Sequence, residues 1–391
     1  LSKAQRVNKA HLRKVAVVAS KFAPHAGGTA VVWTQWCSHW PAGQLTVIAP
    51  KIAGWREFDS AQAYRIVRCA YPDIPKIRMP WLWLHQAARL MNECLKCRPP
   101  LIHLSHVFEN GFMGPILKAC LGIPYFVHTY GEELVYAWRR PGLRQLVSKV
   151  LDQADGVTTI SRYTEGLHRR FGFDRPALMV HPAVDTERYH IGPSLKLAQR
   201  KFGLPEGPLL LTTGRLMKRK GHDSVIRLLP TVLQSFPDLN YAIAGVGPYQ
   251  ENLQRLVEEL GLARRVHFLG RVSDEDLPVL TREASLFVHP NRITEDGDVE
   301  GFGIVFLEAA ASGVAVIGGR SGGVPDSVND GVNGVLVETD QELYNQLIRL
   351  LSDHQLRQEM GTAGREWARS FSWGGASSKV WDYSFSQLRQ H

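Results

Sequence analysis

Short apolar runs alternate with amphipathic segments along almost the whole chain of 391 residues. Short runs bounded by glycine, proline or polar residues are typical of strands buried on both faces of a parallel sheet. Several of the longer segments between them repeat apolar residues at helical spacing. This alternation predicts the α/β class rather than a β-sandwich or a helix bundle.

The apolar runs fall into two series, which predicts two parallel sheets. The first series comprises residues 15–19, 45–49, 64–67, 101–104, 125–129 and 156–160. The second comprises residues 209–213, 239–244, 265–269, 286–289, 314–317 and 335–337. Late helices are predicted over 341–351, 356–369 and 376–388. The segment 181–208, which is rich in proline, glycine and mixed charge, is predicted to connect the two halves.

Charge is distributed unevenly between the two halves. The net charge of +9 divides into +12 for residues 1–190 and −3 for the remainder. A basic half favours an anionic partner, either a membrane surface or nucleic acid. Residues 78–89 and 138–149 combine bulky apolar groups with cations, as helices on a membrane surface do, although helices that pack on their own core share this pattern. No RNA- or DNA-binding module is recognisable, which argues against nucleic acid.

The sequence predicts a cytoplasmic protein. No apolar run is long enough to span a bilayer, and the first one ends at Lys21, too early for the core of a signal peptide. The five cysteines are an odd number, which indicates reduced thiols. Cys94 and Cys97 have the spacing of a zinc-binding pair, but no second pair follows at the required distance, so no metal is predicted.

The segment from residue 298 to 308 combines a glycine turn with two carboxylates. The turn Gly301-Phe302-Gly303 precedes an apolar helix that we expect to begin at Ile304, and a helix N-terminus offers unpaired N–H groups to phosphate or sugar oxygens. Glu300 lies just before this helix, and Glu308 lies one turn beyond Ile304. Both carboxylates can then accept hydrogen bonds from sugar or ribose hydroxyls at the carboxyl edge of the sheet. The alternative is solvated surface and capping.

Cations follow the first strand of the second series. Arg215 can form a fork to phosphate oxygens, and Lys220 offers a compact charge at the start of a helix. Departure of a nucleoside diphosphate builds negative charge, which a fixed cation pair would stabilise without a metal. The spacing is not that of a Walker loop, and a solvated basic turn remains the alternative.

Two features of the first half also follow predicted strands. His128 stands at the carboxyl end of 125–129, where α/β proteins bind ligands, although a packed, hydrogen-bonded core histidine is the alternative. Gly27 and Gly28 follow the first strand and would let the backbone approach a phosphate or a sugar. A plain turn would have the same glycines.

These motifs together resemble the retaining glycosyltransferases of family 4, which have the GT-B fold, and the resemblance spans nearly the whole chain. The chain looks most similar to the phosphatidylinositol mannoside mannosyltransferases and to bacterial mannosyltransferases of cell-surface polysaccharides. The motifs that carry the resemblance are the Gly27-Gly28 turn, His128 in His-Thr-Tyr-Gly, Val184–Tyr189, Gly214-Arg-Leu with Arg-Lys-Gly221, Glu300 with Glu308, Ser321–Pro325 and Phe371-Ser-Trp373.

The resemblance implies two Rossmann-like domains that face each other across a cleft. The N-terminal acceptor domain would comprise residues 1–186 and a crossover helix at 375–391, and the C-terminal donor domain residues 187–374. The implied reaction transfers a hexose, foremost mannose from GDP-mannose, to a lipid-linked or saccharide acceptor. Configuration at the anomeric carbon would be retained, and no metal or other cofactor would be required.

The resemblance also implies which residues contact the donor. The base would lie near Arg271-Val272-Ser273, and the ribose would be held by Glu308 and the sugar by Glu300. His128 and the Gly27-Gly28 turn would approach the sugar from the N-terminal domain. The groups implied for the diphosphate are Arg215, Lys220 and the backbone of Phe302–Ile304.

Departures from the family pattern concern the acceptor side. Ala183 stands where glycine or asparagine is commoner, and Glu132 follows Thr129-Tyr-Gly131 in place of the commoner His-Gly-x-Asp arrangement. Three alternatives stay open: a UDP-sugar-dependent glucosyl- or N-acetylglucosaminyltransferase of the same family, a sugar-nucleotide 2-epimerase, and a non-catalytic nucleic-acid binder. The basic N-terminal half predicts peripheral contact with the inner face of the cell membrane.

Overall fold

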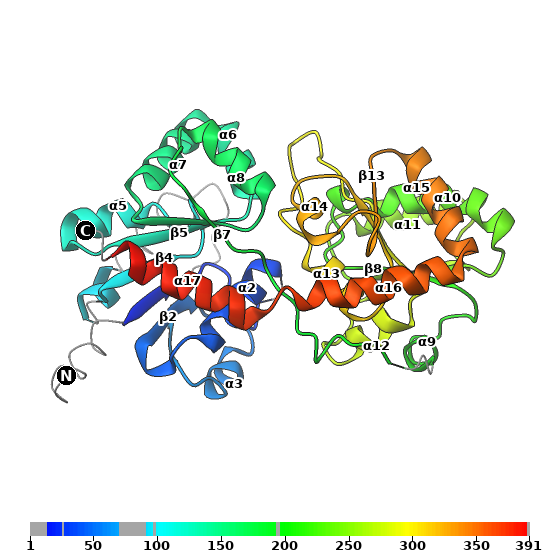
Figure 1. Cartoon of the computed structure of the whole chain (residues 1–391), viewed down its shortest axis with the longest axis horizontal. Helices are drawn as coiled ribbons and strands as arrows, with labels where there is room; N and C mark the ends of the chain where they lie inside the picture. The colour runs from blue at the N-terminus through cyan, green and yellow to red at the C-terminus, as the bar shows by residue number, and fades with distance from the viewer. Residues whose placement is uncertain (1–13, 26, 70–90, 97–98, 193–195, 389–391) are drawn as a thin grey trace. The chain divides into compact units, whose positions relative to one another are not determined.

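The computed structural model describes residues 14–25, 27–69, 91–96, 99–192 and 196–388 (Figure 1). The chain divides into two compact units, Leu1–His181 with Trp373–His391 and Pro182–Ser372. The first unit thus ends slightly before the expected residue 186. The reason is that the backbone N–H of Val184 donates to the carbonyl of Phe371 over 3.3 Å, which joins the start of the connector to the second unit.

The first unit contains a seven-stranded parallel sheet in the order β3-β2-β1-β4-β5-β6-β7. Its central strands are apolar and buried on both faces, as the sequence predicted for strands covered by helices. β7 was not predicted, because a half-buried run of two residues carries no periodicity. The strands are β1 (Val15–Val18), β2 (Leu45–Pro50), β3 (Arg65–Cys69), β4 (Leu101–Leu104), β5 (Tyr125–Thr129), β6 (Gly156–Thr159) and β7 (Leu178–Met179).

Helices connect these strands, and the last helix of the chain also belongs to this unit (Figure 1). The α-helices are α2 (Gly28–His39), α3 (Trp55–Ser60), α5 (Met113–Leu121), α6 (Glu132–Trp138), α7 (Pro141–Gln153), α8 (Arg162–His168) and α17 (Trp373–Gln387). Short 3₁₀ turns occupy η1 (Ala42–Gln44) and η3 (Arg169–Phe171).

The expected return of the C-terminal helix to the first unit is confirmed, since α17 packs on α2. The rings of Trp40 and Trp381 lie 5.4 Å apart. Trp40 Nε1 donates to the carbonyl of Ser377 over 3.1 Å, and Ser377 Oγ donates to the carbonyl of Trp36 over 3.0 Å. Both polar contacts are buried, so they fix the register of α17 in addition to the apolar packing.

The second unit contains a six-stranded parallel sheet in the order β10-β9-β8-β11-β12-β13. The strands are β8 (Leu209–Thr213), β9 (Asn240–Ala244), β10 (Val266–Gly270), β11 (Leu286–His289), β12 (Val316–Gly319) and β13 (Gly334–Val337). The helices are α9 (Leu197–Lys201), α10 (His222–Ser235), α11 (Gln250–Glu259), α12 (Asp276–Glu283), α13 (Ile304–Ala311), α14 (Val324–Ser327), α15 (Asp340–Ser352) and α16 (His354–Arg369), with a 3₁₀ turn η4 (Lys218–Lys220).

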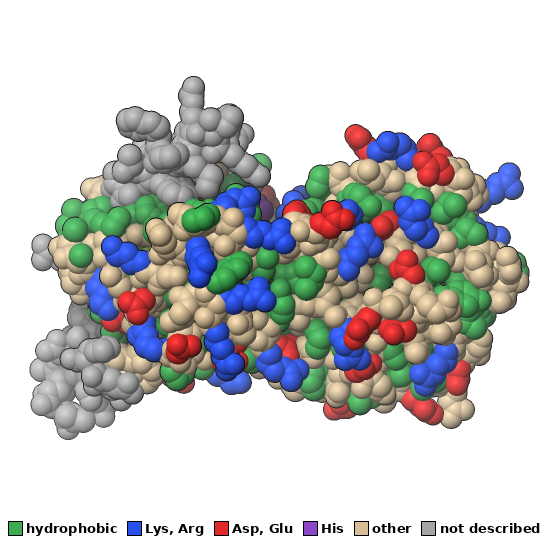
Figure 2. Space-filling model, turned by 90° about the horizontal axis from the view of Figure 1, so that it is seen from above, with side chains coloured by type: hydrophobic (Ala, Val, Ile, Leu, Met, Phe, Trp, Pro, Cys, Tyr) green, Lys and Arg blue, Asp and Glu red, His purple; other side chains and the backbone are tan. Residues whose placement is uncertain are grey.

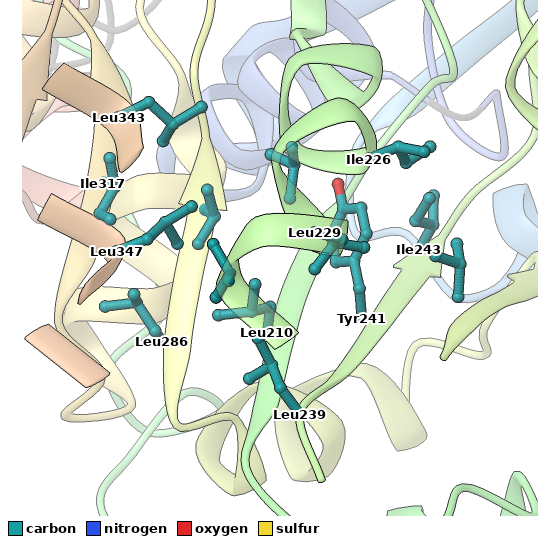
Figure 3. Packing of buried hydrophobic residues seen from close by; sticks show 14 of the residues in the cluster. Leu210, Ile226, Leu229, Leu239, Tyr241, Ile243, Leu286, Ile317, Leu343 and Leu347 are labelled. Carbon is teal, nitrogen blue, oxygen red and sulfur yellow. The ribbon is translucent and has the colours of Figure 1, made fainter. Parts of the chain in front are cut away.

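Successive side chains along each strand of this sheet point to opposite faces, which divides the core of the second unit into two layers. Leu210 and Tyr241 pack against Leu229 of α10 on one face (Figure 3). Leu211 points to the other face, where it belongs to the cluster that includes Phe306 of α13. Complete burial of one such side chain contributes about 1.5–3 kcal/mol. The two layers therefore hold α10 and α13 on opposite faces, each of them beginning at the carboxyl edge of the sheet.

Each sheet has a topological switch point, where neighbouring strands send the chain in opposite directions. In the first sheet, β1 and β4 are neighbours, although β1 continues to β2 and β4 to β5. In the second sheet, β8 and β11 have the same relationship, with β9 and β12 on their far sides. Loops that leave a switch point diverge and open a crevice at the carboxyl ends, which is where open α/β sheets bind ligands.

Candidate active site at the carboxyl edge of the second sheet

A lysine–glutamate ion pair occupies the switch point of the second sheet. Lys220 ends η4 in the loop after β8, and Glu300 lies in the loop between β11 and α13. Lys220 Nζ lies 2.6 Å from Glu300 Oε2, and their side chains are only 9% and 12% exposed. Gly221 follows Lys220 with a φ of 74° and is the N-cap of α10, so Lys220 stands next to a helix start, as the sequence predicted.

Three nitrogen-bearing side chains surround the Glu300 carboxylate. Besides Lys220, the amide of Asn291 donates to Glu300 Oε2 over 3.2 Å. The guanidinium of Arg219 lies 3.9 Å from the same oxygen and 3.5 Å from Asp298 Oδ1. Glu300 is therefore held in one position by groups from the β8 and β11 loops.

The pair is stable in its charged form. Burial raises the pKa of the Glu300 carboxyl, but the charges of Lys220 and Arg219 and the hydrogen bond from Lys220 outweigh burial, so that this pKa lies below its ordinary value. Burial lowers the pKa of the Lys220 amine, Glu300 opposes this effect, and Arg219 adds to it. An ion pair of this kind needs both partners, because either charge alone would be left buried and uncompensated.

Two buried histidines lie close to Lys220. His222 begins α10 and His289 ends β11, and their ring centroids are 5.6 Å apart. Within the described part of the chain, none of the four ring nitrogens has a hydrogen-bond partner. Burial, together with the charges of Lys220 and Arg292, lowers the pKa of His222 to about 3, and burial and Lys220 also keep the pKa of His289 far below its usual range. Both rings are therefore neutral, and they add no charge to the site.

Backbone contacts around Glu300 explain the glycine-rich motifs. A Cβ on Gly322, whose φ is 58°, would lie 2.2 Å from the carbonyl oxygen of Glu300, so only glycine fits there. The N–H of Gly323 donates to the same carbonyl over 2.9 Å. Gly303 adopts a φ of 93° and precedes Ile304, the first residue of α13, as predicted. Ser327 Oγ donates to the carbonyl of Phe302 over 2.8 Å, which fixes the turn that also contains Gly301.

The second predicted carboxylate, Glu308, faces a different set of groups. Burial raises the pKa of Glu308 to about 7, whereas Arg188 and the hydroxyl of Tyr189, which is hydrogen-bonded to the carboxyl, lower it. Arg188 Nη2 lies 3.2 Å from Asp274 Oδ1 in the loop after β10. Lys220 also contributes to the electrostatics of Glu308, so the two predicted glutamates share one charged region.

The predicted base-binding segment leads into this region. Arg271 is exposed and follows directly after β10, and Val272 packs partly against the core cluster of the α13 face. Ser273 Oγ donates to Asp276 Oδ2 over 2.7 Å at the start of α12, so this short loop is held at both ends. The role of Arg271 and Val272 in binding a base stays a prediction.

Arg215 was expected to act together with Lys220 as a pair of cations, but it is not the cation found beside Lys220. Its side chain is exposed, and it makes no ion pair or side-chain hydrogen bond within the described ranges. The cation beside Lys220 and Glu300 is Arg219 instead. The sequence placed both arginines in one basic turn, but only the folded turn shows that Arg219 points to the carboxylates and Arg215 to solvent.

His128 lies in the core of the first unit rather than with a ring free to meet a donor. It is 1% exposed, and its Nε2 and Nδ1 lie 2.9 Å from His103 Nδ1 and 2.6 Å from Thr158 Oγ1. His103 Nε2 in turn lies 3.2 Å from Ser384 Oγ of α17. Burial and His103 hold the pKa of His128 well below its ordinary value. His128 is therefore a packed, hydrogen-bonded core histidine, which was the alternative interpretation of its sequence position. A role of His128 in catalysis stays a prediction.

The remaining predicted features have mixed outcomes. Gly27 has a φ of 134° and precedes the first residue of α2, Gly28, so its conformation requires glycine, and a Cβ there would meet no described atom within 4 Å. The basic segment 78–89 and Cys97 lie outside the described residues, whereas 138–149 belongs mostly to α7. No helix within the described ranges is long and apolar enough to cross a bilayer.

The two Rossmann-like units have the fold of the GT-B glycosyltransferases, and the comparisons with known proteins show the family. Residues 26–188 match the family described as Glycosyltransferase Family 4, and residues 196–367 match Glycosyl transferases group 1. The chain belongs to the family 4-type glycosyltransferases.

Individual relatives are similar over most of their length. The chain is 36% identical over 336 residues to a GDP-mannose-dependent alpha-(1-6)-phosphatidylinositol monomannoside mannosyltransferase of Mycolicibacterium smegmatis, covering 83% of this chain and 85% of the relative. It is 30% identical over 393 residues to a Mycobacterium tuberculosis protein of the same name, covering 95% and 98%. Sucrose-phosphate synthase from Thermosynechococcus elongatus shares the fold, with a TM-score of 0.83, 20% identity and coverage of 97% and 100%.

Proposed function

We propose that this glycosyltransferase moves a hexose, foremost mannose from GDP-mannose, to a lipid-linked or saccharide acceptor. The observation that carries the proposal is the Lys220–Glu300 pair at the switch point of the second sheet. It combines a cation for a diphosphate with a carboxylate for sugar hydroxyls in one place.

When the donor binds, Lys220 and Glu300 each change their interaction partner. The diphosphate replaces Glu300 as the counterion of Lys220, and sugar hydroxyls replace Lys220 as donors to Glu300. Asn291 and Arg219 keep the carboxylate in place during the exchange, because they contact it independently of Lys220. Each charged group therefore keeps a partner, which avoids leaving a buried charge uncompensated.

The leaving group is stabilised by cations of the chain. When the bond to the sugar breaks, negative charge grows on the β-phosphate, and the fixed ammonium of Lys220 lies ready to stabilise it. Arg215 is exposed at the same carboxyl edge and can fold onto the phosphates as a second cation. The proposed reaction therefore requires no metal and no other cofactor, and it retains the configuration of the sugar, as the family resemblance implies.

Support for mannose comes from the relatives. The mycobacterial proteins that are 36% and 30% identical carry names that specify GDP-mannose as donor and a phosphatidylinositol mannoside as acceptor. We propose the same donor for this chain, with the ribose on Glu308 and the base near Arg271 and Val272. The glycines of the turn Gly301-Phe302-Gly303 would let the donor approach the start of α13.

We also propose peripheral contact with an anionic membrane surface through the first unit. On the visible face of that unit, Lys and Arg side chains outnumber acidic ones, whereas both signs are interspersed on the second unit (Figure 2). The guanidinium of Arg144 in α7 lies 3.8 Å from the ring centroid of Trp138 at the end of α6, and that of Arg140, between the two helices, lies 3.6 Å from the ring centroid of Tyr136. Such cation–aromatic pairs suit the interface between phosphate headgroups and acyl chains.

A donor panel tests the proposal. The purified protein is incubated with GDP-mannose, GDP-glucose, UDP-glucose and UDP-N-acetylglucosamine, and nucleotide release is followed with and without mannosides and with EDTA. The proposal expects release that is fastest with GDP-mannose, unaffected by EDTA, and an α-linked product by NMR. Preference for a UDP-sugar would reassign the donor, free N-acetylmannosamine would indicate a 2-epimerase, and neither binding nor turnover with any sugar nucleotide would end the proposal.

A further inference from the structure

Arg292 joins the two loops that carry Lys220 and Glu300. It lies in the same loop as Glu300, shortly after β11, and its side chain is 32% exposed. Its Nη2 donates to both carboxylate oxygens of Asp223, over 2.8 Å and 2.7 Å, and its Nη1 donates to Ser224 Oγ over 3.2 Å. Asp223 and Ser224 belong to the first turn of α10, which follows η4. The guanidinium therefore bridges the β11 loop and the start of α10.

The backbone of Arg292 makes a second contact, on the other side of Lys220. The N–H of Arg292 donates to the carbonyl of Arg219 over 2.9 Å. A Cβ on Gly221, whose φ is 74°, would lie 2.1 Å from the carbonyl oxygen of Pro290, so the backbones of the two loops are in direct contact there. Arg292 thus contacts the chain before Lys220 through its backbone and the chain after Lys220 through its side chain.

Asp223 also connects this bridge to the loop after β9. The hydroxyl of Tyr249 is hydrogen-bonded to the same carboxylate, and the N–H of Tyr249 donates to the carbonyl of Leu216, in the β8 loop, over 3.1 Å. A Cβ on Gly247 would lie 2.4 Å from that carbonyl oxygen, so the β9 loop packs closely on the β8 loop. Within the described ranges, the only ion pair of Asp223 is the one with Arg292. One carboxylate therefore connects three loops, and Arg292 supplies its positive charge.

The bridge affects the distance between the two charged groups of the site. Lys220 and Glu300 lie in different loops, and their ion pair of 2.6 Å is itself a link between these loops. When a diphosphate binds Lys220, as proposed, that link is lost. Arg219 still contacts Glu300, but at 3.9 Å, whereas Arg292 contacts both oxygens of Asp223 at hydrogen-bond distance. Arg292 therefore remains as the strongest charged link between the loops in the donor complex.

We propose that Arg292 is a positioning residue for sugar transfer. Its contacts on both sides of Lys220 set the position of the Lys220 ammonium relative to the Glu300 carboxylate while the donor is bound. Arg292 acts through these two groups rather than on the substrate, because its guanidinium is committed to Asp223 and Ser224. The inference rests on the proposed function and deepens it, since it names the residue that keeps the diphosphate and sugar subsites aligned.

Arg292 also neutralises the Asp223 carboxylate, and this role can be separated from positioning. The side chain of Asp223 is 12% exposed, so an unpaired charge there would lower stability. The double variant Arg292→Ala/Asp223→Asn removes the bridge without leaving that charge. The backbone hydrogen bond from residue 292 to Arg219 is available in every variant, so the β11 loop keeps this attachment.

The test compares Arg292→Ala and this double variant with the wild type and with the matched control Arg320→Ala. Arg320 follows β12 in the same unit and forms ion pairs with Asp330 and Glu338 beside β13. The rate of GDP release from GDP-mannose gives kcat and KM, in the presence of the mannoside that stimulates release most. Affinities for GDP and GDP-mannose are measured by calorimetry, and thermal melting is recorded for each protein.

We expect Arg292→Ala and the double variant to lose about 10²-fold in kcat, as a displacement of about 1 Å in a bound reactant does. GDP affinity should match that of Arg320→Ala, whereas GDP-mannose affinity should fall by up to about tenfold, because Glu300 no longer meets the sugar. The melting temperature should fall in Arg292→Ala and recover in the double variant, whereas kcat should not recover.

A double-mutant cycle with Glu300 shows whether Arg292 acts through this carboxylate. If it does, Arg292→Ala should cause no further loss of GDP-mannose affinity in the Glu300→Gln background, because residues that act as a unit are not additive. Additive losses would overturn the inference. So would a wild-type kcat in Arg292→Ala/Asp223→Asn, or the same ratio of GDP-mannose to GDP affinity in Arg292→Ala and Arg320→Ala. Absence of binding of every sugar nucleotide to the wild type would instead refute the proposed function itself.

Discussion

Lys220 Nζ and Glu300 Oε2 lie 2.6 Å apart where β8 and β11 send the chain in opposite directions. The two residues come from separate loops, so the contact depends on the whole sheet rather than on local sequence. In the proposed function, this ion pair marks the junction of diphosphate and sugar. Because each residue of the pair can be replaced separately, the proposed function makes a prediction for each of them.

Replacement of Lys220 by alanine should remove the charge that stabilises the leaving diphosphate. We expect kcat/KM for nucleotide release to fall roughly 10²–10³-fold, or about 2.7–4 kcal/mol, by analogy with the loss of an oxyanion donor. Lys218→Ala is the control, because Lys218 is an exposed cation in the same turn η4. Equal activity of the two variants would contradict the role of Lys220.

Loss of stability must be separated from loss of catalysis in that experiment. Lys220→Ala leaves Glu300 buried without its main partner, and breaking a buried pair in this way costs about 3–5 kcal/mol. We expect the double variant Lys220→Met/Glu300→Gln to recover most of the lost stability in urea titrations but none of the activity. Recovery of activity together with stability would show that the pair only supports the fold.

Replacement of Arg215 by alanine should reduce catalysis without reducing stability. The side chain is exposed and unpaired within the described ranges, so its removal should change the free energy of unfolding by no more than about 0.5 kcal/mol. If Arg215 folds onto the phosphates, kcat/KM falls roughly 10²-fold or more. Steady-state kinetics beside a urea titration checks both statements, and near-normal turnover would remove Arg215 from the site.

Glu308 should make nucleotide affinity depend on pH. Burial, its largest influence, raises the pKa of this carboxyl from 4.5 to about 7. The ionised form is the acceptor for ribose hydroxyls, so we expect GDP to bind more tightly as the pH rises from about 6 to about 8. Calorimetric titrations across that range measure the change, and Glu308→Gln should abolish it.

The same group should affect the stability of the nucleotide-free protein in the opposite direction. The folded state binds this proton more tightly than the unfolded chain does. Its contribution to stability is therefore fully present below pH 4.5 and is lost as the pH rises through about 7. The difference in unfolding free energy between wild type and Glu308→Gln should change over this window. A difference that is constant with pH would show that Glu308 titrates normally.

His128→Ala tests whether the buried histidine has a structural role. The change removes hydrogen-bond partners from His103 and Thr158 and leaves a cavity beside Trp33, whose ring lies 4.6 Å from that of His128. We expect a loss of roughly 2–5 kcal/mol in unfolding free energy. Thermal denaturation checks this loss, and an unchanged melting temperature together with lost turnover would favour a catalytic role instead.

The sequence predicted most of the fold, because burial on both faces gives each strand an uninterrupted apolar run. Of the thirteen strands in the described ranges, twelve were predicted, and β7 was missed. The start of α13 at Ile304 was predicted for a separate reason: glycine tolerates the φ of 93° that Gly303 adopts before the helix. Periodicity and turn chemistry are local properties, and they determined these outcomes.

The candidate site was predicted less completely, because side-chain direction depends on distant partners. The sequence identified the cations of the basic turn, but only the contacts of Arg219 with Asp298 and Glu300 show that this side chain faces the site. Asn291 had no local signal, since its importance follows from one hydrogen bond to Glu300. The hydrogen bond of Tyr189 to Glu308 joins residues far apart in sequence, although both stood in motifs that the resemblance had marked.

Calorimetric titration of GDP and GDP-mannose into wild type and Glu300→Gln tests the central claim most directly. The account predicts that wild type binds both ligands, that Glu300→Gln binds GDP about as well as wild type, and that only its GDP-mannose affinity falls, by about tenfold or more. Equal losses for the two ligands, or no binding of either ligand to wild type, would contradict the claim that Glu300 holds the sugar while Lys220 holds the diphosphate.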